Sequence, residues 1–271
     1  MIPFMAQHSA YLSLLQLTDL HILATPQDML LGINTEHYFR AVLAMAFAEQ
    51  PHFDLMLLTG DLAQDPCTAS YQRIVEHLLP YQTPCVCLPG NHDNYPLMQE
   101  VLNVAQVNCR KQVVFANWQV INLNSQIVGA PNGRLASQEL VFLKQCLLDY
   151  PQLNALIAVH HNCLPTKSAW MDTMTIQNSA AFLDLVVQFP QVKVISTGHI
   201  HQTMDTYYGD IRVLGTPSTC FQFTPNSKAF SVDNTAPGYR TLKLYDNGQI
   251  DTAVYRLPNK LTELQTHIGG Y

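Results

Sequence analysis

Short apolar runs that end in polar residues recur along much of the chain. Their length, and the Gly, Asp or Asn residues that close them, are typical of buried β-strands. The five clearest runs are YLSLLQLTD, FDLMLLTGD, PCVCLPGNHD, LNALIAVHH and VKVISTGH. These runs predict a sheet whose strands lie in the interior of the protein.

The segments between these runs place apolar residues at helical spacing and predict helices. Residues 35–50, for example, carry Phe39, Val42, Leu43 and Phe47 on one stripe. Further helices are predicted over residues 70–79, over a segment that Ser137 caps, and over residues 177–189. Strands that alternate with helices in this way are typical of an α/β fold.

The pattern changes in the last third of the chain, where the strand-like segments are separated only by turn signals. They are IRVLGTP, GYRTLKLYD and QIDTAVYRL, and Asp246-Asn247-Gly248 predicts a hairpin turn. This part is expected to form antiparallel or mixed sheet. No linker divides the chain, so we expect one α/β domain over residues 1–271, with two packed mixed sheets and helices outside. Residues 258–271 carry little pattern and are expected to form a partly mobile tail.

Composition excludes several classes of function. The 14 basic and 20 acidic side chains give a formal charge of -6, so a nucleic-acid polymer is not an expected partner. We find no pattern of a secretory leader, and no apolar run reaches the roughly 18 residues of a membrane span. Seven scattered cysteines form no paired framework. These features together favour a reducing, cytoplasmic location.

The residues that could carry chemistry cluster where the predicted strands end. In an open α/β sheet the carboxyl ends of the strands share one edge, so loops distant in sequence can bring their side chains together. The candidates are Asp19, His21, Asp61, Asn91, His92, Asp93, His160, His161, His199 and His201. Imidazole and oxygen donors without thiolate suit iron, manganese or zinc.

The number of candidate ligands favours two metal ions over one. About seven donors are too many for one tetrahedral ion and suit two ions that share a carboxylate, roughly 3.5–4 Å apart, as in phosphatases and nucleases. Two divalent ions, two aspartates and a bridging hydroxide would leave a net positive charge that attracts a phosphodiester. We expect two divalent cations, with Fe²⁺ as the favoured metal and Mn²⁺ or Zn²⁺ as alternatives.

The motifs D-x-H, G-D, G-N-H-D, a His pair and G-H-x-H, in this order over residues 14–201, resemble the calcineurin-like metallophosphoesterases. Flanking segments are similar to the bacterial class III 3',5'-cyclic-AMP phosphodiesterases over nearly the whole chain. These segments include LLGINT, TGDLAQD, HHNCLP, GHIHQ, TPSTCFQF and APGYRTLKL. The resemblance implies a four-layer αββα sandwich that hydrolyses 3',5'-cyclic AMP, a small-molecule substrate, to 5'-AMP.

The resemblance also implies which residues hold the metals. The first metal would be held by Asp19, His21 and His201. The second would be held by Asn91, His160 and His199. Asp61 would bridge the two ions, and a hydroxide between them would attack phosphorus.

The residues that follow Asn91 are implied to act on the substrate. His92 would protonate the departing O3' as general acid. Asp93 is interpreted as a carboxylate that orients His92 or a metal-bound histidine. Adjacent residues of an extended segment point to opposite faces, so His160 and His161 are not expected to bind one ion. The resemblance favours His160 as the metal ligand. His161 would then either support the metal ligands from outside the metal site or face the phosphate or nucleotide of the substrate, together with Asn91 and His92.

Each motif alone has a plainer interpretation as a turn or a structural residue. Only their joint occurrence at strand ends favours a metal site. The segment Thr216-Pro217-Ser218-Thr219 could be a simple turn or could line the substrate cleft. His37 and His77 are interpreted as surface residues of helices and His52 as a residue before a strand, and none of the three is expected to be a ligand.

Two alternative functions stay open at this point. A broader diesterase that acts on 2',3'-cyclic nucleotides would show the same motifs, because a two-metal centre binds the phosphate group of the substrate and not its base. A non-catalytic scaffold of the same fold would be expected to lose ligands or His92, and this chain retains all of them.

Overall fold

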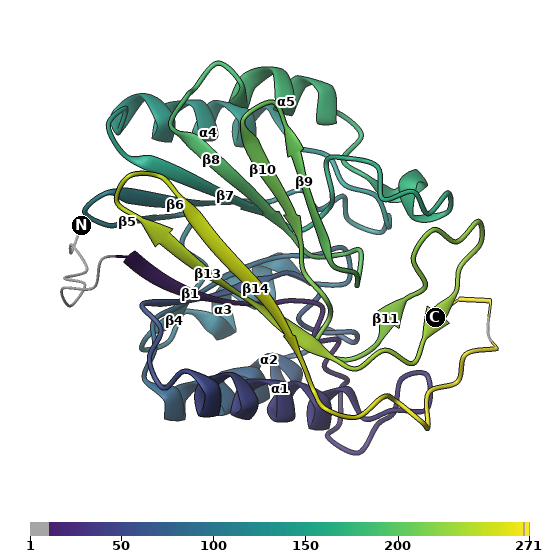
Figure 1. The fold of residues 1–271 in the computed structure, drawn as a ribbon. Helices are drawn as coiled ribbons and strands as arrows, with labels where there is room; N and C mark the ends of the chain where they lie inside the picture. The colour runs from purple at the N-terminus through teal and green to yellow at the C-terminus, as the bar shows by residue number, and fades with distance from the viewer. Residues whose placement is uncertain (1–10, 268, 271) are drawn as a thin grey trace.

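The computed structural model describes residues 11–267 and 269–270, in which two six-stranded sheets pack face to face (Figure 1). In spatial order the first sheet contains β14 (Ile250–Arg256), β13 (Gly238–Tyr245), β1 (Tyr11–Leu17), β2 (Leu55–Thr59), β3 (Cys85–Leu88) and β4 (Val107–Asn108). The second contains β5 (Gln112–Val114), β6 (Trp118–Leu123), β7 (Asn154–Val159), β8 (Val192–Thr197), β10 (Ile211–Gly215) and β9 (Met204–Tyr208).

Helices cover the outer face of each sheet (Figure 1). The first sheet is covered by α1 (Thr35–Glu49), α2 (Thr68–Leu78) and α3 (Tyr95–Leu102). The second is covered by α4 (Ser137–Asp149) and α5 (Ser179–Val186). The prediction of two mixed sheets flanked by helices is therefore confirmed. Smaller elements are the 3-10 turns η1 (Leu79–Tyr81) and η2 (Met171–Met174) and the ribbon of β11 (Gln222–Phe223) and β12 (Val232–Asp233).

The central strands are buried on both faces, which explains their continuous apolar sequence. In β1, Leu14 packs between the two sheets in one core cluster with Leu57 and Trp118. The next residue, Leu15, points the other way and packs in the cluster that contains Phe39 of α1. This alternation gives three apolar layers between four layers of secondary structure.

Parallel pairing brings the carboxyl ends of the site-bearing strands to one end of each sheet. The pairs β1–β2, β2–β3 and β7–β8 are parallel. The strands of the last third extend the sheets: β13 pairs antiparallel with β1, and β10 pairs parallel with β8. The hairpin between β13 and β14 is confirmed, with Gly248 at a φ of 86°.

Some predicted boundaries were wrong. Ser137 is the first residue of α4, and the residue before it, Ala136, is the N-cap without a side-chain hydrogen bond, so Ser137 is not the cap. The sequence analysis also missed α3 and the strands β4, β5, β6, β9, β11 and β12. These elements are short or lie at sheet edges, apart from β6, and short elements give little periodicity to detect.

The described part of the C-terminal tail packs against the body of the protein. Leu261 and Leu264 are buried, the Leu261 amide donates to the Asn234 carbonyl at 2.9 Å, and the Gln265 amide donates to the Leu31 carbonyl at 2.9 Å. Whether the tail moves, and whether residues 1–271 form one domain, stay predictions. Among the described residues, no helix has the length and apolar character needed to cross a membrane.

Candidate metal centre

The polar residues at the strand ends come together where the two sheets meet. The carboxylate of Asp19, which follows β1 of the first sheet, accepts the backbone N–H of His199, which follows β8 of the second, at 3.0 and 3.1 Å. The Gly198 amide donates to the His160 carbonyl at 3.1 Å and links the loops after β7 and β8. Backbone hydrogen bonds therefore fix the loops of both sheets against each other.

One group of possible ligands comprises Asp19, His21 and His201. The Nε2 atom of His201 lies 3.3 Å from Oδ1 of Asp19 and 3.2 Å from Nε2 of His21. All three residues are buried, and their possible ligand atoms lie within 4.8 Å of one another. These are the three residues predicted to hold the first metal, and the structure brings them together.

A second group is centred on the Asp61 carboxylate. Its Oδ2 atom lies 3.2 Å from Nε2 of His160 and 3.9 Å from Nε2 of His21, and its Oδ1 atom accepts the backbone N–H of His92 at 2.9 Å. Asp61 thus touches one predicted ligand of each metal. The role of Asp61 as a bridging carboxylate stays a prediction.

The third group contains His160 and His199 and also His161. Nε2 of His160 lies 3.2 Å from Oδ1 of Asn91, which is another predicted ligand of the second metal. His161 lies with its ring centroid 4.6 Å from that of His199, and its possible ligand atom belongs to the same group. The Nε2 atoms of His161 and His199 are both buried without a hydrogen-bond partner. His161 therefore lies beside the predicted ligands, and the role of its ring stays a prediction.

The backbone is strained at the site. Asp19, His21, Asp61, His199 and His201 all have a positive φ, between 44° and 65°. They make up half of the ten non-glycine residues with positive φ in the described part of the chain. Such left-handed residues are costly, and their concentration here is typical of functional sites whose side chains the backbone must aim.

Glycines allow the loops to approach each other. A Cβ atom at Gly90 would overlap the carboxylate and backbone nitrogen of Asp61. A Cβ atom at Gly198 would overlap the hydroxyl of Thr18 and approach the Asp19 carboxylate. The glycines that open G-N-H-D and G-H-x-H are therefore required because a neighbouring loop fills the place of a side chain.

The charge states of the buried groups suit cation binding. Burial lowers the pKa of His21 and of His161 to about 3 and that of His199 well below its usual value, so these imidazoles are neutral at pH 7. Burial opposes ionisation of Asp61, but the neighbouring His160 and His92 outweigh it and hold the pKa well below its usual value. For His160 the carboxylates outweigh burial and raise the pKa to about 9. A cation at this site would replace that proton.

Neutral imidazoles, ionised carboxylates and two unpartnered buried imidazole nitrogens together fit a pair of divalent cations. Hydrogen bonds behind the ligands keep the rings aimed at the centre, because Nδ1 of His160 is bonded to the Thr59 carbonyl and Nδ1 of His201 to the Phe221 carbonyl, each at 2.8 Å.

A family model described as calcineurin-like phosphoesterase matches residues 12–203. The chain belongs to the calcineurin-like phosphoesterase family. The predicted family is thereby confirmed, and the site described above lies at the residues that carried the resemblance.

Curated relatives within the family cover almost the whole chain. A protein of Vibrio vulnificus named 3',5'-cyclic adenosine monophosphate phosphodiesterase CpdA is 44% identical over 91% of this chain and 90% of its own length. The protein of the same name from Escherichia coli K12 is 40% identical over 97% of this chain and 96% of its own length. The protein of the same name from Pseudomonas aeruginosa is 36% identical over 98% of this chain and 100% of its own length.

Solved structures of the same fold are more distant. A dimetal phosphatase from Danio rerio has a TM-score of 0.61 at 13% identity and covers 90% of this chain and 98% of its own. A purple acid phosphatase from yellow lupin has a TM-score of 0.59 at 12% identity and covers 94% of this chain and 55% of its own. At such identities the likeness shows the fold alone.

Several residues around the family motifs were missed by the sequence analysis. Gln64 bonds through Oε1 to Nδ1 of His21 at 2.8 Å, and the Ser125 hydroxyl lies 2.7 Å from Nδ1 of His161. Gln126 donates to backbone carbonyls of the G-N-H-D loop. Glutamine and serine are common on surfaces, so their residue types gave no signal, although Gln64 lies within the TGDLAQD segment, three positions after Asp61.

The hydrogen bonds observed for the Asp93 carboxylate come from backbone amides and a tyrosine hydroxyl, and not from an imidazole ring. Its carboxylate accepts the amides of Leu62 and Ala63 at 3.1 Å and of Gly90 at 2.9 Å, and the Tyr71 hydroxyl at 3.0 Å. Burial and the nearby Asp61 charge raise the Asp93 pKa to about 6. Asp93 therefore joins the loop after β2 to the loop after β3.

The remaining candidates lie outside the metal groups. Ser218 is buried and donates to the Asp19 carbonyl at 2.7 Å, so its segment supports the Asp19 loop, and a role in the substrate cleft stays a prediction. His37 is exposed, as predicted, and His52 is exposed as well. His77 is partly exposed and lies 2.7 Å from Glu36.

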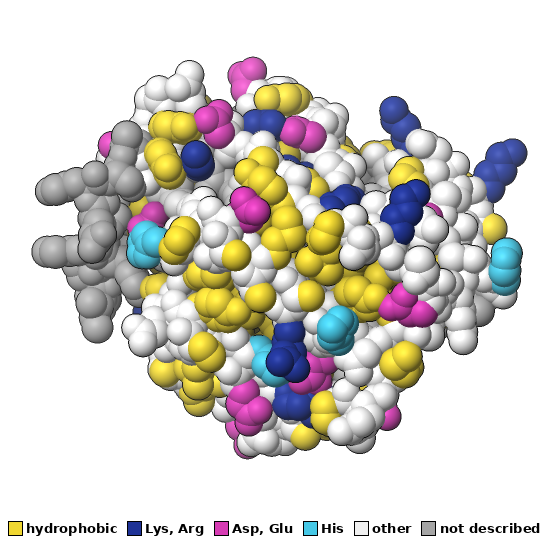
Figure 2. All heavy atoms as spheres, turned by 60° about the horizontal axis from the view of Figure 1, so that its bottom comes forward, with side chains coloured by type: hydrophobic (Ala, Val, Ile, Leu, Met, Phe, Trp, Pro, Cys, Tyr) yellow, Lys and Arg dark blue, Asp and Glu magenta, His cyan; other side chains and the backbone are white. Residues whose placement is uncertain are grey.

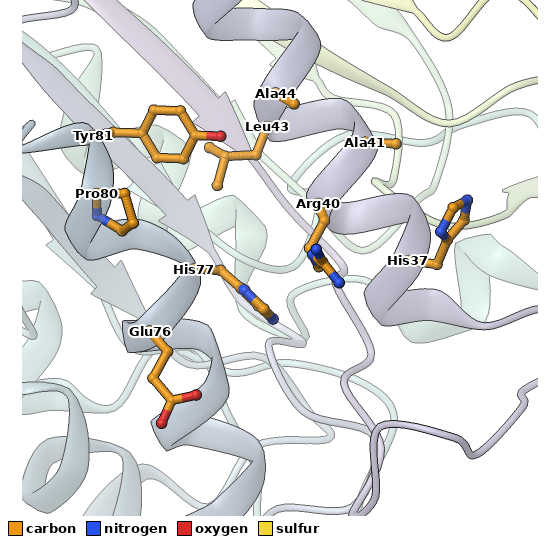
Figure 3. A pocket seen from close by; sticks show the side chains of 9 residues that line it. All are labelled: His37, Arg40, Ala41, Leu43, Ala44, Glu76, His77, Pro80 and Tyr81. Atoms are coloured by element: carbon orange, nitrogen blue, oxygen red, sulfur yellow. The ribbon is translucent and has the colours of Figure 1, made fainter.

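A cavity lies between α1 and α2 (Figure 3). Its volume is about 440 Å³, and Arg40, His77 and Tyr81 are among its lining residues. None of its lining residues is a candidate ligand. On the face of the described residues that Figure 2 shows, basic and acidic side chains are interspersed.

Proposed function

We propose that this chain hydrolyses 3',5'-cyclic AMP to 5'-AMP at a two-metal centre. The proposal is carried by the gathering of the predicted ligands into neighbouring groups, two of which contain Asp61, in a chain that is 36–44% identical to relatives named 3',5'-cyclic adenosine monophosphate phosphodiesterase. The relatives support the substrate, and the ligand geometry supports the chemistry.

The predicted ligands divide into two sets that share Asp61. Asp19, His21 and His201 would hold one cation, and Asn91, His160 and His199 the other. When bound, two divalent cations would polarise the phosphoryl oxygens and supply a hydroxide nucleophile near neutral pH. Imidazole and oxygen donors suit Fe²⁺, and Mn²⁺ or Zn²⁺ would fit the same donors.

His92 is the proposed general acid. Its backbone N–H is bonded to Asp61, its ring centroid lies 5.1 Å from that of His21, and the residue is half-buried. From this position the imidazolium would protonate O3' as the bond to phosphorus breaks, and the product would leave with a free 3'-hydroxyl. General acid catalysis of this kind contributes typically about 10²–10⁴-fold.

The substrate is tested by side-by-side kinetics with each metal. Apo-protein reconstituted with Fe²⁺, Mn²⁺ or Zn²⁺ would be assayed on 3',5'-cyclic AMP, 3',5'-cyclic GMP and 2',3'-cyclic AMP. We expect the highest kcat/KM on 3',5'-cyclic AMP. A clear preference for 2',3'-cyclic AMP would replace the proposal with a broader diesterase.

The cysteines bear on the compartment. All seven are free in the structure, and six of them are buried. Free thiols in this number are typical of a reducing compartment, so we propose that the protein works in the cytoplasm on a small cyclic nucleotide.

A further inference from the structure

Gln126 lies in a loop of the second sheet and reaches across to the G-N-H-D loop of the first. Its side-chain nitrogen donates to the Gly90 carbonyl at 2.8 Å and also to the Asp93 carbonyl. A primary amide has two N–H donors on one nitrogen, so a single side chain can bind both carbonyls. The two residues between these carbonyls are Asn91 and His92.

The loop that carries Gln126 is itself fixed. The Arg134 amide donates to the Ser125 carbonyl at 2.8 Å, and Gln126 pairs with Gly133 in an antiparallel bridge. Gly133 in turn accepts the Gln177 amide at 2.8 Å. Gln126 therefore projects from an anchored hairpin and not from a loose loop.

The G-N-H-D loop is consequently held from two sides. The Asp93 carboxylate ties it to the amides of Leu62 and Ala63 in the first sheet, and Gln126 ties it to the second sheet. Asn91 has a further restraint through its contact with His160, and a bound cation would add another. The backbone of His92 lies between the two carbonyls that Gln126 binds, so the position of the loop sets where the His92 ring begins.

We propose that Gln126 is a positioning residue that sets the place of the His92 ring for proton delivery to the leaving group. The inference rests on the proposed function of His92 as general acid. A misplacement of about 1 Å in a reacting group can cost roughly 10²-fold in rate. Loss of Gln126 should therefore slow the release of a poor leaving group and spare a reaction that needs no proton.

The test compares two substrates in the metal-loaded enzyme. Gln126→Met keeps the chain length and removes both donors, and Gln126→Asn is too short to bind both carbonyls. On 3',5'-cyclic AMP, whose leaving alkoxide needs a proton, kcat should fall roughly 10- to 100-fold. On bis(4-nitrophenyl) phosphate, whose leaving group is stable as an anion, kcat should stay within about threefold of wild type.

The matched control is Gln191→Met. The Gln191 side chain also donates to a backbone carbonyl, that of Leu147 at 2.9 Å, but it lies before β8, at the end of the sheet opposite the site. It should leave both rates unchanged. Metal content by elemental analysis and melting temperature would be measured for every variant.

Several results would overturn the inference. An equal loss on both substrates, a loss of bound metal, or rates equal to those of Gln191→Met would each do so, and so would failure of both Gln126 variants to fold. If wild type does not hydrolyse 3',5'-cyclic AMP, the proposed function fails. The same comparison would then be made with 2',3'-cyclic AMP, another diester with a poor leaving group, and would still decide the role of Gln126.

Discussion

Nε2 of His160 lies 3.2 Å from Oδ2 of Asp61, although the two residues follow strands of different sheets. The contact exists because β2 and β7 both end at the edge where the two sheets meet, and Gly60 and Gly90 leave room for the imidazole and the carboxylate. The two sheets must therefore keep their relative position for the predicted metal ligands to stay together.

Substitution of the shared carboxylate should remove both metals. Asp61→Asn keeps the size of the side chain but loses the charge that compensates two cations, and it leaves His160 without its ionic partner. Substitution of a residue that hydrogen-bonds to a metal ligand lowers metal affinity by about 10–100-fold. Loss of a bridging ligand itself should therefore lower metal affinity by at least about 10²-fold. Equilibrium dialysis and cyclic AMP turnover would measure the loss.

The control for this prediction is Asp54→Asn. The Asp54 carboxylate accepts the Ser13 amide at 2.8 Å near the start of β2, at the opposite end of the strand from Asp61. Metal content should be unchanged in this variant. Full metal retention by Asp61→Asn would refute the bridging assignment.

Gln64 should tune the first metal site through His21. Its Oε1 atom accepts from Nδ1 of His21, which leaves Nε2 facing Asp61 and His201. Gln64→Leu removes this acceptor and should weaken binding at one of the two sites by about 10–100-fold, because such partners fix the tautomer of a ligating imidazole. Gln64→Glu keeps an acceptor and should bind metal more tightly than Gln64→Leu. Calorimetric titration with Mn²⁺ would separate them, and equal affinities would contradict the prediction.

The sequence predicted the site best where polar residues directly follow buried apolar runs. Strand-end residues such as Asp19, Asp61 and His199 stood out because polar side chains are costly next to buried apolar runs, and the structure brings them together. The fold followed from the same runs, since strands buried on both faces require two covering layers.

Other features could not be predicted because they depend on tertiary contacts. The alternation rule predicted that His160 and His161 point apart, but the loop after β7 leaves extended geometry, and both rings border the same group. Gln126 is unremarkable in sequence because its two acceptors are backbone carbonyls of a distant loop. The ends of α3 and the short edge strands depend on packing for the same reason.

The ion pair between Glu36 and Arg73 should make stability depend on pH. Glu36 accepts from Arg73 at 2.8 Å and from His77 at 2.7 Å, and Arg73 also donates to the carbonyls of Leu23 and Ala24 in the loop after His21. Burial alone would raise the Glu36 pKa, but His77 and Arg73 outweigh it and lower the pKa below its usual value of 4.5.

A carboxyl group whose pKa is lower in the folded than in the unfolded state stabilises the fold at pH values above its unfolded-state pKa. This stabilisation is lost as the pH falls through its folded-state pKa. Glu36→Gln should therefore lower the free energy of unfolding by about 1–3 kcal/mol at pH 7. The difference between wild type and variant should shrink below about pH 4.5. Urea unfolding at pH 7 and at pH 4 would measure both values. A difference that grows on acidification would contradict this account.

Leu261 should contribute to stability as a core residue although it lies in the C-terminal tail. It is 1% exposed and packs in one cluster with Phe221 and Phe223, whose rings lie beside His201. Leu261→Ala should lower the free energy of unfolding by about 2–5 kcal/mol, the usual range for a buried leucine. Leu148→Ala is the control, because Leu148 in α4 is 53% exposed and should cost little.

The same pair of variants decides whether the tail is mobile near this residue. If the segment around Leu261 spent much of its time detached, Leu261→Ala would cost no more than Leu148→Ala. Hydrogen exchange at the Leu261 and Gln265 amides, which donate to the Asn234 and Leu31 carbonyls, would report the same equilibrium directly. Slow exchange at both amides together with a large loss of stability would establish the tail as part of the wall that supports His201.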